Sequence, residues 1–82
     1  ITSSDIQIVP NPANTFVTLS LQAVHDNMKV ALYNTLGQQL LQTTLAADMN
    51  EITLSVDSFP TGVYYLKVSS DNQAFYKQLL LD

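Results

Sequence analysis

The sequence contains no cysteine, no arginine and no tryptophan. Without cysteine the chain has no disulfide, no thiolate metal ligand and no thiol nucleophile, so apolar packing has to stabilise it. Its three cations are all lysines, and against seven Asp and Glu residues they leave a net charge of −4. Nucleic acids and anionic membrane faces are bound by basic surfaces, so we expect neither as a partner.

Long apolar runs are absent as well. No stretch approaches the roughly 18 apolar residues of a membrane-spanning helix, so we expect no direct membrane insertion. No charged segment precedes an apolar one in the way an export signal requires. Because the chain begins with Ile1 rather than Met, we expect it to be a piece of a longer precursor. Its length suits one core, and we expect a single domain over residues 1–82.

What the sequence does have is alternation of apolar and polar residues with a period of two. Seven segments show this pattern, at residues 6–8, 17–23, 29–34, 38–45, 52–56, 63–70 and 74–81. Turn-forming residues separate them at a spacing of roughly 8–12 residues, and no segment has a sustained helical period. The pattern predicts an all-β fold, a seven-stranded antiparallel β-sandwich of immunoglobulin-like type.

Some details of this sandwich follow from the sequence and some stay open. Gly37 is the expected position of positive φ in a hairpin after residues 29–34. The stretch "VPNPAN", residues 9–14, predicts a rigid corner after the first strand, because proline lacks an amide donor. The faces of segment 38–45 are poorly sorted. In segment 74–81 the inward residues are either Phe75, Leu79 and Leu81 or, with a bulge, Tyr76 and Leu80.

No residue pattern points to catalysis. His25 is the single histidine, and a solvated loop position is the favoured interpretation because no nucleophile accompanies it in a recognisable motif. The carboxylates are scattered over turns and ends, so we expect no enzyme, no metal site and no cofactor. Tyr33, Tyr65 and Tyr76 either form an exposed aromatic set or, the favoured interpretation, pack at sheet margins.

Four motifs occur in a fixed order: "VPNPAN", "KVALYNTLGQQL", "FPTGVYYLKV" and "FYKQLLLD". Together they resemble the type A C-terminal sorting domain of the type IX, or Por, secretion system. That family's pattern runs roughly Y-P-N-P-A, V-x-I-Y-N-x-x-G-Q, L-x-x-G-x-Y-x-x-K-I and a basic pair before a final aliphatic strand. The resemblance covers the chain from about Ile6 to Leu81.

The resemblance assigns signal or recognition roles to the residues that match these motifs. They are Pro10, Asn11, Pro12, Tyr33, Asn34, Gly37, Gln38, Gly62, Tyr64, Lys67, Lys77, Leu79, Leu80 and Leu81. Two departures stand out. The basic pair is reduced to Lys77, and Asp82 stands where the family often ends in lysine. If the secretion machinery recognises positive charge at the C-terminal motif, this domain is a weaker signal than other family members. Otherwise the machinery recognises the apolar final strand.

For function, the resemblance implies a non-catalytic signal at the end of a cargo protein. It implies transit through the periplasm, recognition by outer-membrane secretion and shuttle proteins, and arrival at the cell surface or secretion. A cell-surface sortase then removes the domain, which we expect to be a monomer. The alternative interpretation, from the tyrosines and acidic loops, is an accessory adhesion or glycan-binding module of a secreted protein.

Overall fold

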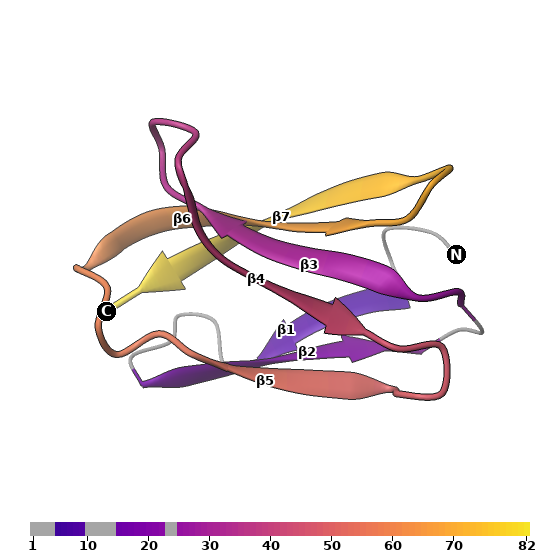
Figure 1. The fold of residues 1–82 in the computed structure, drawn as a ribbon. Helices are drawn as coiled ribbons and strands as arrows, with labels where there is room; N and C mark the ends of the chain where they lie inside the picture. Colours follow the sequence, from indigo (N-terminus) through magenta and orange to yellow (C-terminus); the bar gives the residue numbers. More distant parts are fainter. Residues whose placement is uncertain (1–4, 10–14, 23–24) are drawn as a thin grey trace.

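The computed structural model describes residues 5–9, 15–22 and 25–82. These contain seven β-strands (Figure 1). The strands are β1 (Ile6–Val9), β2 (Phe16–Leu21), β3 (Met28–Tyr33), β4 (Gln39–Leu45), β5 (Glu51–Ser55), β6 (Gly62–Ser69) and β7 (Ala74–Leu81). In the parts of the chain described, no helix has the length and apolar character needed to cross a membrane.

The strands form two sheets. One has three strands in the order β1-β2-β5, the other four in the order β4-β3-β6-β7, and every pairing is antiparallel. Figure 1 shows one sheet stacked on the other. In a constant-type immunoglobulin domain the fourth strand joins the sheet of the first two, whereas here β4 pairs with β3. The predicted seven-stranded antiparallel β-sandwich is confirmed.

The core lies between the sheets and is built from alternate residues of the strands, because successive side chains of a strand point to opposite faces. The alternation predicts Val17, Leu19, Leu21 and Ala23 on one face of the second strand and Tyr64, Leu66 and Val68 on one face of the sixth. All of these are buried except Ala23, which lies outside the described residues. The core cluster consists of Ile6, Val17, Leu19, Leu21, Met28, Val30, Leu32, Leu45, Leu54, Val56, Tyr64, Leu66, Val68, Leu79 and Leu81.

Strand β7 resolves the parity that the sequence left open. Its pairing with β6 runs without a register shift, so no bulge intervenes. Leu79 and Leu81 are buried, and Phe75 packs against the core. Tyr76 and Leu80 are exposed. The first of the two alternatives is therefore confirmed.

Strand β4 carries the irregularity instead. Leu32 pairs with Leu41, but the next residue, Tyr33, pairs with Gln39. Leu40 is thus an extra residue, as in a β-bulge, and both Leu40 and Leu41 pack against the core. This bulge is the reason that the two faces of the segment look poorly sorted in the sequence.

Candidate functional site

The β3–β4 hairpin is built by its motif residues. The Asn34 side-chain oxygen accepts hydrogen bonds from the backbone N–H groups of Leu36, at 2.9 Å, and Gln38, at 3.0 Å. Its Nδ2 donates to Oε1 of Gln38 at 2.8 Å. Gly37 has a φ of +83°, as predicted for this turn. Asn34, Gly37 and Gln38 therefore satisfy the backbone of the turn with their own atoms.

The corner before β6 is built by another motif. The Tyr64 hydroxyl donates a hydrogen bond of 2.6 Å to the carbonyl oxygen of Pro60, and its ring centroid lies 6.2 Å from that of Phe59. A tyrosine near the start of this strand that bonds to backbone a few residues upstream is a tyrosine corner, a feature of immunoglobulin-like sandwiches. Gly62 has a φ of +154°, which L side chains rarely adopt. Both residues shape the fold.

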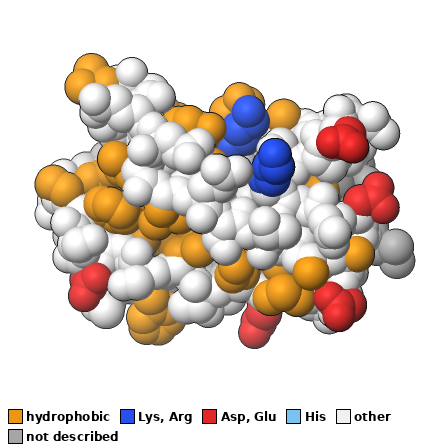
Figure 2. All heavy atoms as spheres, viewed as in Figure 1, with side chains coloured by type: hydrophobic (Ala, Val, Ile, Leu, Met, Phe, Trp, Pro, Cys, Tyr) orange, Lys and Arg blue, Asp and Glu red, His pale blue; other side chains and the backbone are white. Residues whose placement is uncertain are grey.

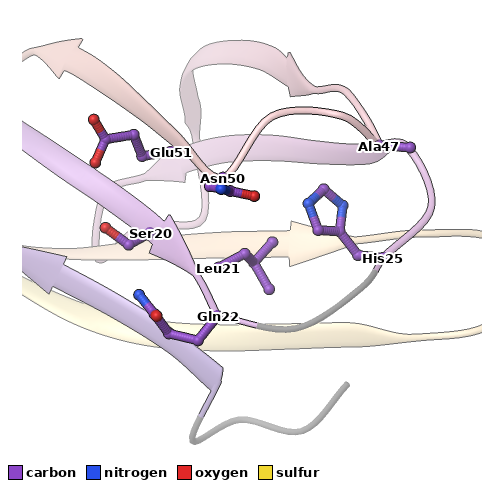
Figure 3. A pocket seen from close by; sticks show the side chains of 7 residues that line it. All are labelled: Ser20, Leu21, Gln22, His25, Ala47, Asn50 and Glu51. Carbon is purple, nitrogen blue, oxygen red and sulfur yellow. The ribbon is translucent and has the colours of Figure 1, made fainter.

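His25 lies in a shallow hollow of about 470 Å³, which Figure 3 shows from close by. The expectation of a solvated loop histidine is wrong, because only 9% of the side chain is exposed. Its Nδ1 lies 2.7 Å from the carbonyl oxygen of Asp26, and its Nε2 lies 2.8 Å from that of Met49. Both ring nitrogens thus face backbone acceptors, and neither is directed at Ser20 or Glu51 across the hollow. His25 ties two loops together.

The outer face of the four-stranded sheet carries aromatic side chains. Tyr33 of β3 is directly opposite Tyr65 of β6, and Lys67 of β6 is directly opposite Tyr76 of β7. Tyr65 is 40% exposed and Tyr76 61% exposed. With residues of the β3–β4 hairpin, the three tyrosines line a hollow of about 380 Å³. The favoured interpretation, tyrosines packed only at sheet margins, does not hold for this face.

This face also carries two of the three lysines, Lys29 and Lys67, whereas Lys77 is on the other face. The strands of the four-stranded sheet contain all three lysines and none of the carboxylates. The Lys67 ammonium lies over the Tyr76 ring, 5.8 Å from its centroid. Figure 2 shows lysine side chains together over β3 and β6, with Asp and Glu side chains towards the ends and lower side of the view. The sequence gives no hint of this separation until the strand pairing is known.

Comparison with known families decides what kind of domain this is. Residues 7–82 match the family model of the secretion system C-terminal sorting domain. The chain belongs to that family. The sorting domain is therefore a C-terminal secretion signal of the type IX system, which implies interaction with the secretion machinery and export to the cell surface or secretion.

The chain is also similar to a curated protein and to a solved structure. The sorting domain is 28% identical over 82 residues to an endo-acting ulvan lyase of Formosa agariphila. The alignment covers 99% of this chain but only 16% of that protein's length, about a sixth. A DUF3244 family protein from Bacteroides vulgatus with an immunoglobulin-like β-sandwich fold superimposes with a TM-score of 0.71 at 16% identity. That likeness, over 90% of this chain and 83% of the other, confirms the immunoglobulin-like fold.

The motif residues of the sorting domain divide by position. Seven of the eleven motif residues that the structure describes are buried or fixed in turns, namely Asn34, Gly37, Gln38, Gly62, Tyr64, Leu79 and Leu81. Leu80 is 42% exposed, and Tyr33, Lys67 and Lys77 are half-buried. Pro10, Asn11 and Pro12 lie outside the described residues, so the corner expected there stays a prediction.

Proposed function

We propose that the type IX machinery recognises this domain in its folded form, in the periplasm, and then moves the attached cargo across the outer membrane. The observation that carries this proposal is the position of the family motifs in the structure. Asn34 and Gly37 form a turn, and Tyr64 forms a corner. Residues that form the turns and the core are poorly placed to contact the secretion machinery directly. This favours recognition of the surface of the folded domain, which these residues stabilise.

The part of that surface proposed for recognition is the second half of β7. Leu80 belongs to the final motif, yet its side chain lies opposite Val63 on the outer face and is 42% exposed. A leucine at such a position adds little to the core. Lys77 is the one basic residue of this motif and is half-buried. Packing in the core therefore does not explain why the motif has a leucine and a lysine at these two positions.

The remaining steps of the proposal are supported by the family assignment alone. Outer-membrane secretion and shuttle proteins bind the domain as a monomer, and a cell-surface sortase then cleaves it from its cargo. The domain is the substrate of this peptidase and performs no chemistry itself. The geometry of His25 supports a non-catalytic role, because a general base needs a nitrogen free to take the substrate proton and both of its nitrogens face carbonyl oxygens.

A reporter fusion tests the sorting function. Residues 1–82 are fused behind a fluorescent protein that carries a Sec signal, in a host with a working type IX system. We expect fluorescence at the cell surface or in the medium, and periplasmic retention when the same fusion is made in a host that lacks the type IX system. Retention of all reporter in the periplasm of the competent host contradicts the proposed function.

Replacement of His25 by alanine should lower stability without stopping export. The change removes the ring's part-buried contacts with the carbonyl oxygens of Asp26 and Met49, between loops that Ala47 N–H and Asn27 Oδ1 also connect at 2.8 Å. We expect the free energy of unfolding to fall by about 1–3 kcal/mol, measured by urea denaturation, and the reporter still to be secreted. A His25→Ala variant that is folded by circular dichroism but retained would show that the imidazole has a direct role.

A further inference from the structure

The hollow on the outer face of the four-stranded sheet has the features of a small binding site. Its wall is the β3–β4 hairpin, which stands out from the sheet in Figure 1. Its lining residues are Tyr33, Asn34, Thr35, Gly37, Tyr65 and Tyr76. The volume of about 380 Å³ falls within the range of ligand pockets, roughly 300–1,000 Å³. Aromatic side chains dominate it, as they do in such sites.

Side-chain hydrogen bonds connect the residues in the wall of this tyrosine hollow. The Tyr33 hydroxyl donates to Oε1 of Gln39 at 3.3 Å, and Asn34 is fixed by its three side-chain hydrogen bonds to Leu36 and Gln38. A site whose side chains are fixed before the ligand arrives loses less conformational entropy on binding. The exposed rings of Tyr65 and Tyr76 extend the hollow across β6 and β7.

Cations border the tyrosine hollow on one side. Lys67 follows Tyr65 by two residues on the same face of β6, and it is opposite Tyr76 of β7 and Ala31 of β3. Lys29 pairs with Ser69, so it is a diagonal neighbour of Lys67, at a spacing of roughly 7–8 Å. No carboxylate lies in the strands of this sheet, although the loop residues Asp26 and Asp71 line a separate hollow with Lys29. An anionic group next to the rings is therefore favoured by charge complementarity.

We propose that the tyrosine hollow and Lys67 bind an acidic saccharide. The apolar C–H face of a pyranose ring packs on the tyrosine rings, whose faces carry negative charge density. The sugar's hydroxyl groups reach water and the tyrosine hydroxyls, and its carboxylate pairs with the Lys67 ammonium. A proline-rich peptide also suits aromatic-lined grooves, but it brings no counter-charge to Lys67.

Titration of the 82-residue chain with tetragalacturonate tests this site. Tyrosine fluorescence and NMR amide shifts report binding, since there is no tryptophan to obscure the tyrosines. Neutral galactotetraose, a polyglutamate peptide and a proline-rich peptide serve as comparison ligands. We expect tetragalacturonate to bind more tightly than all three and to shift the amides around Tyr65, Lys67 and Tyr76. The affinity should fall as salt is raised, because the partly exposed ammonium is screened.

Variants identify the residues responsible. Tyr76→Ala should weaken tetragalacturonate binding about tenfold, the equivalent of about 1.4 kcal/mol, and Tyr76→Phe should keep most of it. Lys67→Gln should weaken binding several-fold and flatten its salt dependence. Lys77→Gln is the matched control, because it removes the same charge from the other face of the sheet.

Four results would overturn the saccharide proposal. They are no binding of tetragalacturonate, equal binding of galactotetraose or polyglutamate, preferential binding of the proline-rich peptide, and an unchanged affinity in folded Tyr76→Ala. The titration uses the isolated chain and no secretion machinery. It therefore bears on the saccharide site alone, whatever the outcome of the export experiment.

Discussion

Deletion of residues 75–82 should abolish export of an attached reporter. These residues supply nearly all of β7, which pairs with β6 along eight residues, and they include the buried side chains of Leu79 and Leu81. Burial of a leucine contributes about 1.5–3 kcal/mol. Loss of both, together with the strand ladder, approaches the whole free energy of unfolding of a small domain, about 5–15 kcal/mol. The measurement is the secreted fraction of reporter, with circular dichroism of the purified fusion tail.

A second variant separates recognition from folding in this experiment. Leu80→Glu changes a side chain that is 42% exposed and leaves Leu79 and Leu81 in place. We expect a free energy of unfolding within about 0.5 kcal/mol of the parent, as is usual for surface substitutions, and a clear loss of export. If folded Leu80→Glu is exported like the parent, the exposed half of β7 is not what the machinery reads.

The strands themselves were predictable, because apolar and polar residues alternate with a period of two along a strand that has one buried face. Val17, Leu19 and Leu21 had to share a face, and the structure buries all three. The same reasoning failed to sort β4, where the extra residue Leu40 inverts the parity near the start of the strand. A bulge is set by pairing with a neighbouring strand, and pairing is not visible in one strand's sequence.

The candidate sites were even harder to predict from the sequence, because they depend on which strands pair and in which register. Tyr65 and Tyr76 were visible as tyrosines, but only the register of β6 with β7 sets Lys67 opposite Tyr76. His25 was misjudged for a related reason. The absence of a catalytic motif around it suggested a solvated loop position, whereas the acceptor at Met49 lies 24 residues further along the chain. The tyrosine corner at Tyr64 had a local signal, since its acceptor, Pro60, is only four residues upstream.

Unfolding the domain while leaving every motif intact should also abolish export. Leu19 lies in β2, outside the four motifs, and is fully buried. Leu19→Asp loses the leucine packing and leaves a carboxylate in the core without a partner, at a cost of about 5 kcal/mol or more. For 82 residues the expected stability is only about 0.05–0.15 kcal/mol per residue. We therefore expect Leu19→Asp to be unfolded by circular dichroism and its reporter to stay in the periplasm.

Leu36→Asp is the matched control for this experiment, because it makes the same chemical change at the tip of the β3–β4 hairpin. Leu36 is 82% exposed, so we expect stability within about 0.5 kcal/mol of the parent and normal export, although the substitution falls inside a motif. The pair separates two kinds of signal. A machinery that reads the motifs as a linear peptide exports Leu19→Asp, whereas one that reads a folded surface exports only Leu36→Asp. Secretion of the unfolded Leu19→Asp fusion at the parental level contradicts recognition of the folded domain.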